Sequence, residues 1–307
     1  MDNYQTQSLK SNKTGRLHEY IQINTLPSGF RNYCNRDIPI TKVLVRGLVY
    51  SEMVSLKKLP TVDLEQMKLI YQDVIVFPED SSMTLGDLEL IDFLTLVTLV
   101  TIYTVRDFRW DYKGYCPSCK MPLATTLGIQ DVNFNVNTFR ALPLDLNLTV
   151  GGESKTYKLR VLTVDDIIRL KALKLDQDIE RMYEVASSLS PDTQEVSDEG
   201  FQKTLHEVFN MEYSDITMIN SVIMELTPGM PYFTIECSNP RCRSTSQIEF
   251  NMDVLNITPD KPLRDLYELK YLWQRSFNSA LNTEDLYSDI IEMLKIHNEY
   301  VEASKGK

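Results

Sequence analysis

Four of the five cysteines fall into two close pairs, which carry the clearest chemical signal in this 307-residue sequence. The first pair lies in Cys116-Pro117-Ser118-Cys119, and the second lies in Cys237-Ser238-Asn239-Pro240-Arg241-Cys242. A tetrahedral zinc site can take four thiolates from two short turns, because a tight turn directs two sulfurs at one ion. The pairs therefore predict a structural zinc ion with four ligands, namely Cys116, Cys119, Cys237 and Cys242.

The spacing of the pairs leaves two alternatives open. The second pair encloses residues 238–241 and is wider than the first, and residues 120–236 separate the pairs, far more than in compact zinc motifs. One alternative is a redox-active C-x-x-C pair. The other is a set of buried thiols or an opportunistic disulfide. A disulfide is disfavoured because the polar N-terminal sequence, with no apolar secretory segment, predicts a reducing cytoplasm.

Catalytic roles fit these residues less well. A catalytic zinc ion keeps one position open for water, whereas four cysteines complete the ligand set. Cys34 is the odd cysteine and is interpreted as a plain thiol. No recognisable motif surrounds His18, His206 or His297.

The common catalytic frameworks are absent from the sequence, which has no P-loop, G-x-G-x-x-G, G-x-S-x-G or H-E-x-x-H motif. The adjacent acids Asp165 and Asp166 are interpreted as a helix start, and the acids within residues 195–199 as part of an exposed loop over residues 187–200. We therefore expect a protein that is not an enzyme.

The charge balance argues against a phosphate-rich partner. The chain has 32 basic and 43 acidic residues, for a formal net charge of −11. Such a chain repels nucleic-acid backbones overall, so we expect no nucleic-acid partner. Trp110, Tyr112 and Tyr115 could stack on bases, but contacts with the core or with a protein partner suit an acidic chain better.

Short strands are predicted on both sides of each cysteine pair. Residues 110–115 and 232–236 precede the pairs, and residues 121–127 and 247–250 follow them. Two hairpins of this kind could face each other as a zinc ribbon, with all the intervening residues inserted between its two knuckles.

The rest of the chain has mainly helical periodicity. Apolar residues at helical spacing predict a series of helices near residues 51–59, 64–74, 163–182, 201–209 and 216–226, and again from Pro262 onward. The most apolar segment, residues 88–105, contains Asp92 and a threonine at every third position from Thr95 to Thr104. It is therefore predicted to be a core helix and not a membrane span. The predicted fold class is α+β, mainly helical with short strands, a split four-cysteine zinc ribbon and a helical insertion between the knuckles.

This pattern predicts four parts of the chain. Residues 1–19 are polar and are expected to form a flexible arm. Residues 20–132 together with residues 231–255 are expected to form a core with the zinc ribbon. Residues 133–230 form an inserted, mainly helical region, and residues 256–307 form C-terminal helices.

Several motifs occur in an order that resembles one known family. Pro27-Ser28-Gly29 is followed by Tyr33, then by Thr84-Leu85-Gly86-Asp87 at the start of a leucine-rich helix, and then by Cys116-Pro117-Ser118-Cys119. This order resembles the baseplate hub and hub-assembly proteins of contractile-tailed phages of the T-even type. In that family a "P-S-x-G-x-x-Y" start, an "L-x-x-x-D" helix and a "C-P-x-C" knuckle recur. The likeness covers residues 26–132 and returns weakly at residues 232–250.

The resemblance implies a non-enzymatic component or assembly factor of a phage tail baseplate, in its hub or wedge region. It also implies that Cys116 and Cys119 hold metal. The expected partners are other baseplate and tail subunits within a symmetric assembly, with no membrane partner. The expected location is the virion tail baseplate, assembled in the host cytoplasm. The alternative is a zinc-ribbon regulatory or nucleic-acid-associated protein.

Overall fold

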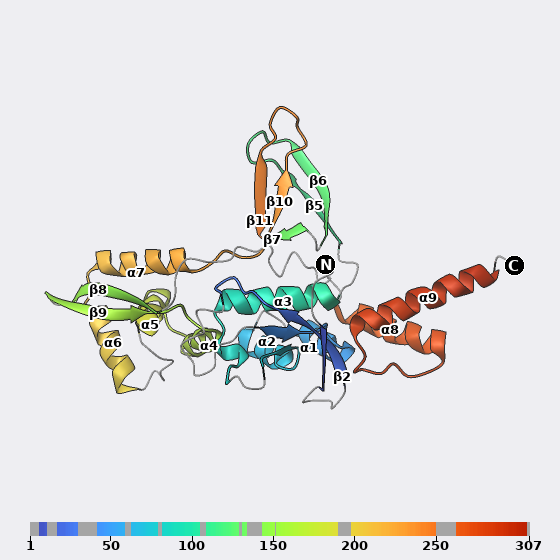
Figure 1. The fold of residues 1–307 in the computed structure, drawn as a ribbon, viewed down its shortest axis with the longest axis horizontal. Helices are drawn as coiled ribbons and strands as arrows, with labels where there is room; N and C mark the ends of the chain where they lie inside the picture. The colour runs from blue at the N-terminus through green and yellow to red at the C-terminus, as the bar shows by residue number, and fades with distance from the viewer. Residues whose placement is uncertain are drawn as a thin grey trace.

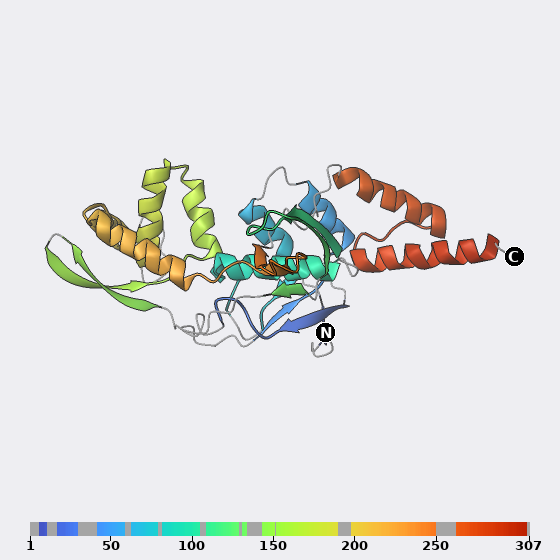
Figure 2. The ribbon, with the colours of Figure 1, turned by 90° about the horizontal axis from the view of Figure 1, so that it is seen from above.

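The computed structural model describes residues 6–10, 17–29, 42–58, 63–78, 82–104, 109–128, 131–133, 143–150, 152–189, 198–249 and 262–305. These residues form an elongated body from which one set of strands projects (Figure 1). Seen from above, residues 144–226 lie at one end of the body and the C-terminal helices lie at the other (Figure 2). Helices and strands both contribute substantially, so the predicted α+β class is confirmed.

A four-stranded antiparallel sheet forms one layer of the body. Its strands lie in the order β1 (Thr6–Lys10), β2 (Leu17–Ile23), β3 (Val43–Val45) and β4 (Ile75–Val76). This arrangement differs from the flexible arm expected for residues 1–19. Backbone pairing with β2 orders the polar segment Thr6–Lys10, and β2 itself begins at Leu17 with His18 buried.

A set of helices packs with this sheet around one hydrophobic core. The helices are α1 (Tyr50–Lys57), α2 (Leu64–Tyr71), α3 (Leu90–Thr104), α8 (Pro262–Phe277) and α9 (Tyr287–Lys305). The core includes side chains from all of them, for example Leu56, Met67, Leu96, Trp273 and Ile290. The C-terminal helices therefore share their core with the N-terminal sheet. A 3₁₀ turn at Leu85–Asp87, rather than α3, carries the capping pair of Thr84 and Asp87.

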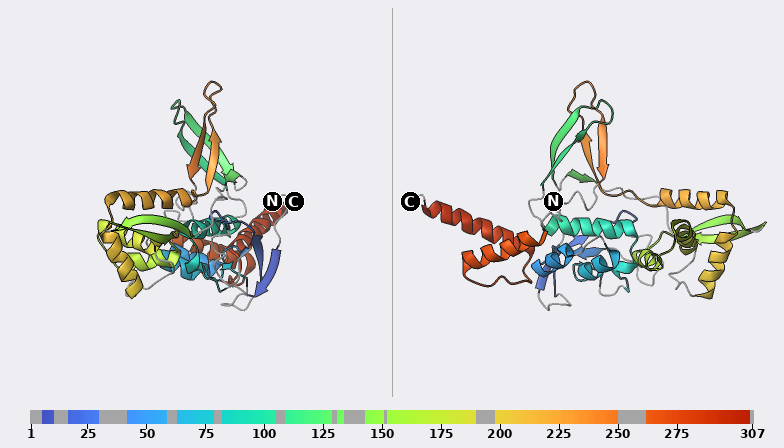
Figure 3. Two further views of the ribbon diagram at one scale, coloured as in Figure 1. Left: turned by 60° about the vertical axis from the view of Figure 1, so that its left-hand side comes forward. Right: turned by 180° about the vertical axis from the view of Figure 1, so that it is seen from behind.

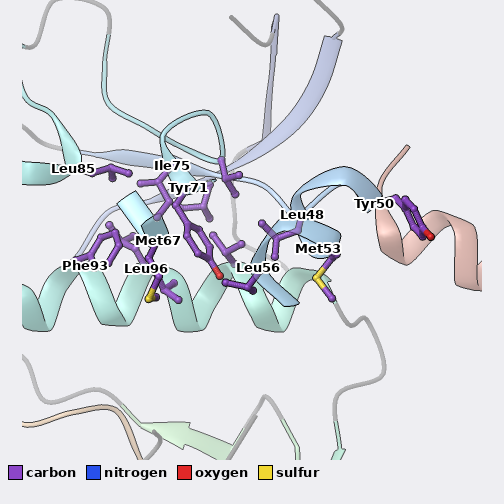
Figure 4. Packing of buried hydrophobic residues seen from close by; sticks show 14 of the residues in the cluster. Leu48, Tyr50, Met53, Leu56, Met67, Tyr71, Ile75, Leu85, Phe93 and Leu96 are labelled. Carbon is purple, nitrogen blue, oxygen red and sulfur yellow. The ribbon is translucent and has the colours of Figure 1, made fainter. Parts of the chain in front are cut away.

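Helix α3 lies at the centre of this core, as predicted from the apolar sequence of residues 88–105. Phe93 and Leu96 lie beside Met67 and Tyr71 (Figure 4), and the rings of Tyr71 and Phe93 meet edge to face with centroids 6.4 Å apart. The polar positions of the helix are also buried, namely Asp92, Thr95, Thr98, Thr101 and Thr104. A helix covered on all sides has to satisfy such groups internally. In the part of the chain that the structure describes, no helix is both long and apolar enough to cross a bilayer.

The buried carboxylate of Asp92 has its partner in the loop after β2. The backbone N–H of Ser28 donates to Asp92 Oδ1 at 2.9 Å, and the Ser28 hydroxyl donates to Asp92 Oδ2. Both residues are almost completely removed from solvent. These hydrogen bonds offset part of the desolvation cost of the carboxylate and tie the loop to the first turn of α3.

Residues 144–226 enclose a second hydrophobic core. Its elements are β8 (Leu144–Val150), β9 (Glu153–Leu159), α5 (Gln177–Leu189), α6 (Glu199–Phe209) and α7 (Tyr213–Leu226). The side chains in this core include Leu148, Leu159, Val185, Phe201 and Ile219. Helix α4 (Val164–Ala172) leads from the hairpin back to the body, where Val164 donates its N–H to Leu88 O at 2.8 Å.

The inserted region differs from the sequence prediction in two places. It contains the β8–β9 hairpin in addition to helices, since Val150 pairs with Glu153 and only two glycines separate them in the sequence. The loop expected at residues 187–200 is shorter. Ser187 and Ser188 are buried in the last turn of α5, and α6 already begins at Glu199. Thr163 and Asp166 form a capping box at the start of α4.

The cysteines lie in a separate set of strands, which we call the cysteine unit. Its strands are β5 (Arg109–Tyr115), β6 (Pro122–Gly128), β7 (Val132–Asn133), β10 (Tyr232–Glu236) and β11 (Thr245–Glu249). The unit projects away from α3 in Figure 1 and in both views of Figure 3. It has its own hydrophobic cluster, whereas the sequence placed the ribbon in one core with the N-terminal strands.

Candidate metal centre

Two antiparallel hairpins bring the four cysteines together. In the first, Tyr115 pairs with Pro122, so residues 116–121 form a first cysteine turn between β5 and β6. In the second, Glu236 pairs with Thr245, so residues 237–244 form a second cysteine turn between β10 and β11. Both turns lie at the end of the cysteine unit that is farthest from the body (Figure 1).

The backbones of the two turns repeat the same hydrogen bonds. Cys116 N–H donates to Met121 O at 2.9 Å in the first turn, and Cys237 N–H donates to Ser244 O at 2.9 Å in the second. Each turn therefore closes its own ends through the backbone of its first cysteine.

The second turn is longer because its first cysteine lies outside the tight bend. In the first turn Lys120 N–H donates to Cys116 O, and in the second Arg243 N–H donates to Asn239 O. Asn239-Pro240-Arg241-Cys242-Arg243 therefore corresponds to Cys116-Pro117-Ser118-Cys119-Lys120. Lys120 and Arg243 both have left-handed backbones, with φ of 59° and 47°. The second pair thus keeps the same tight bend as the first, despite its wider spacing in the sequence. Its other sulfur comes from Cys237, at the end of β10.

The four sulfur atoms lie at the separations that one tetrahedral ion requires. Cys116 Sγ is 3.8 Å from Cys242 Sγ, Cys119 Sγ is 3.6 Å from Cys237 Sγ, and all four lie within 4.8 Å of one another. Sulfurs bound at about 2.3 Å to one tetrahedral ion are roughly 3.8 Å apart. The four predicted ligands are therefore brought together, and they could hold a metal ion.

Hydrogen bonds to the sulfurs favour thiolates at two positions. The pKa of the Cys116 thiol is lowered to about 6, first by the Ser244 hydroxyl and then by the backbone N–H groups of Cys119 and Ser118. The pKa of Cys242 is lowered by the hydroxyl and then by the backbone N–H of Ser244. A metal ligand must be a thiolate, so these donors prepare the site for a cation.

Cys237 shows the opposite electrostatic effect. The backbone N–H of Asn239 lowers its pKa, but desolvation and hydrogen bonding to the neighbouring thiols outweigh this and raise it to about 12. Four crowded thiols cannot all ionise without a cation, because like charges repel at these distances. A bound cation would offset this repulsion and favour the Cys237 thiolate.

In the described part of the chain, a small apolar cluster also connects the two hairpins. The strands β5 and β6 form one sheet, and β11, β10 and β7 form another. Between the sheets the buried apolar side chains are Leu123, Leu127, Phe233 and Ile235. So small a cluster contributes little stability by itself, and a cross-link through four sulfurs would add what the cluster lacks.

The geometry is less suited to the alternative uses of the cysteines. All four thiols are free, and no disulfide joins them. A redox-active cysteine combines a low pKa with access to its partner, but the low-pKa thiol, that of Cys116, is fully buried. With four sulfurs as ligands, no position of a tetrahedral ion is left for substrate or water.

The remaining candidate residues lie away from the sulfurs or outside the described residues. Cys34 is among the residues that the structure does not describe. His18 is buried in β2, His206 lies beside Asn210 on α6, and His297 packs against the ring of Phe277 at 5.1 Å.

The adjacent acids Asp165 and Asp166 both have structural partners. Asp165 pairs with Lys68 at 2.5 Å, and Asp166 accepts from Arg160 and Arg169. Of the aromatic residues considered for base stacking, Tyr115 is 72% exposed at the base of the first cysteine turn.

Ser244 is the site residue that the sequence analysis missed. Its position two residues after the second cysteine of its turn was visible in the sequence. Its contact with a sulfur of the other turn depends on how the two hairpins meet.

A comparison with known proteins finds no matching family model, no matching curated protein and no matching solved structure.

Proposed function

We propose that this protein is a structural component or assembly factor of a contractile phage tail baseplate, in its hub or wedge region. It acts through contacts with other baseplate and tail subunits, catalyses no reaction, and holds a structural zinc ion in the cysteine unit. The observation that carries the proposal is the closed set of four thiols, which spans two hairpins and leaves no open coordination position.

Zinc is the proposed metal because of the ligand type and geometry. Soft thiolates in a tetrahedral set select zinc or iron–sulfur chemistry. Zinc is redox-inert and needs no open position, which suits a cross-link between two weakly joined hairpins. The ion would hold Cys116, Cys119, Cys237 and Cys242 and would neutralise part of the charge of four thiolates.

The baseplate assignment is supported by the residues that carry the family resemblance. Ser28 belongs to the Pro27-Ser28-Gly29 motif, and Asp92 lies in the first turn of α3, the leucine-rich helix that follows Thr84-Leu85-Gly86-Asp87. These two residues hydrogen-bond to each other in the core of the body. Motifs separated in the sequence thus have one joint structural role, which supports treating their order as meaningful.

Purified virions and tail-assembly intermediates test this proposal. A protein inventory by mass spectrometry should detect the chain in baseplates or in their precursors. Elemental analysis of the purified protein should find about one zinc per chain. Absence of the chain from both particles and intermediates would overturn the baseplate assignment, whatever the zinc content is.

One observation favours the alternative, a nucleic-acid-associated zinc-ribbon protein. The two cysteine turns expose three cations, Lys120, Arg241 and Arg243, on a chain of net charge −11. Phosphate contacts make binding fall steeply with ionic strength, whereas an apolar subunit interface responds little. Binding to single- or double-stranded DNA that disappears between low and moderate salt would support this alternative.

A further inference from the structure

Ser244 contacts three of the four cysteines. Its hydroxyl oxygen lies 3.1 Å from Cys116 Sγ and 3.2 Å from Cys242 Sγ, and its carbonyl oxygen accepts the N–H of Cys237 at 2.9 Å. Its side chain is partly buried at the start of β11. The hydroxyl therefore lies between a sulfur of the first cysteine turn and a sulfur of the second.

The position of this hydroxyl matters because the two turns belong to different sheets. The first turn closes through the backbone of Cys116 and the second through the backbone of Cys237, so each is ordered within its own hairpin. The Ser244 hydroxyl crosses from one hairpin to the other at the sulfurs themselves. A hydroxyl has one hydrogen, so it can donate to either sulfur in turn.

This inference rests on the proposed metal site. We infer that Ser244 is a positioning residue that donates a hydrogen bond to the Cys116 and Cys242 thiolates and holds the two turns at the separation of the bound ion. A divalent ion with four thiolates has a net charge of −2, and a donor to the sulfurs reduces that charge on the ligands. The ion can leave only when the two hairpins separate, and the same contact opposes that separation.

The test uses the full-length chain loaded with cobalt(II), which reports on a tetrahedral sulfur site by absorption. The variants are Ser244→Ala, Ser244→Thr and Ser118→Ala. Ser118 is exposed in the first cysteine turn and contacts Cys116 through its backbone N–H, which alanine retains. Two quantities are measured: the energy of the thiolate-to-cobalt charge-transfer band, and the rate of metal loss to an excess of chelator.

Ser244→Ala should bind one cobalt with unchanged tetrahedral ligand-field bands, because all four sulfurs remain. Its charge-transfer band should move to lower energy, since a thiolate without the hydrogen bond is easier to oxidise. Metal loss should be about 10- to 100-fold faster, the usual effect of removing such an outer contact. Ser118→Ala should match the wild type in both quantities.

Ser244→Thr keeps the hydroxyl and should restore both the band energy and the rate. If Ser244→Ala binds no cobalt at all, the threonine variant still tests the role of the hydroxyl. A threonine variant that behaves like the alanine variant would overturn the role of the hydroxyl. So would an alanine variant that is indistinguishable from Ser118→Ala. If the wild type itself binds no cobalt, the metal site fails and this inference fails with it.

Discussion

The body and the cysteine unit are stabilised in different ways. The body surrounds α3 with a large core to which the sheet and the helices α1, α2, α8 and α9 all contribute. Among the residues that the structure describes, the cysteine unit buries only a few apolar side chains between its two sheets, together with four sulfurs. Burial of apolar surface is enough for the first region, whereas the second would gain stability from a cross-link through the proposed ion. The stability of each region should therefore respond to a different perturbation.

Removal of the metal should have the largest effect, and only on the cysteine unit. A structural zinc ion contributes about 10 to 16 kcal/mol of binding free energy in small zinc modules. Cys119→Ser or Cys242→Ser should each reduce zinc from about one per chain to well below half, measured by elemental analysis. Hydrogen exchange should then increase in β5, β6, β10 and β11. Cys34→Ser is the control and should leave the zinc content unchanged.

A charge in the centre of α3 should have the reverse effect. Leu96 is fully buried, so Leu96→Asp should lower the free energy of unfolding of the body by more than about 4 kcal/mol. Leu99 is only partly buried against the same core, and Leu99→Asp should cost less. Chemical denaturation measures both. Zinc content that falls together with body stability in these variants would show that the two regions are not independent.

Asp92→Ala should give an intermediate effect on the body. It removes two hydrogen bonds to the carboxylate and leaves the buried N–H of Ser28 without that acceptor. We expect a loss of about 2 to 3 kcal/mol in unfolding free energy. Ser28→Ala removes only the hydroxyl contact and should cost roughly half as much. Equal losses for the two variants would contradict the assignment of Asp92 as the acceptor of both bonds.

The smallest predicted effect compares the two cysteine turns with each other. Lys120 and Arg243 are both left-handed, a conformation that only glycine adopts without strain. At each position the glycine variant should therefore be more stable than the alanine variant by about 1 kcal/mol, measured from the unfolding of the zinc-loaded unit. At Lys113, in the regular strand β5, the alanine variant should instead be more stable than the glycine variant. If the alanine variant were the more stable one at only one of the two turns, the turns would not be equivalent.

The sequence was sufficient to predict which four cysteines come together, but not all of their surroundings. The types and pairing of Cys116, Cys119, Cys237 and Cys242 indicated one site, and the strands around them fall close to the predicted ranges. The correspondence between Asn239 and Cys116 was not predicted, because it depends on backbone hydrogen bonds. The role of Ser244 depends on the approach of two separate sheets, and no local pattern encodes that approach.

The same distinction applies to the fold. The nearly continuous apolar sequence of residues 90–104 predicted α3 well, because burial and sequence character agree there. The strand Thr6–Lys10 was missed because its residues are polar, and only pairing with β2 orders it. The hairpin β8–β9 had a recognisable signal in alternating leucines followed by Gly-Gly. That signal was overlooked among the helices around it.

The distance along the chain between the two halves of the cysteine unit has a consequence for synthesis on the ribosome. Cys119 and Cys237 are 118 residues apart, and the second core of residues 144–226 lies between them. At about 5 to 20 residues per second, the second pair of sulfurs emerges roughly 6 to 24 s after the first. During that interval the nascent chain offers only half of its coordination shell, so the inserted region can collapse before any ion is captured. The order of translation would thus place capture of the proposed ion after synthesis of the inserted region.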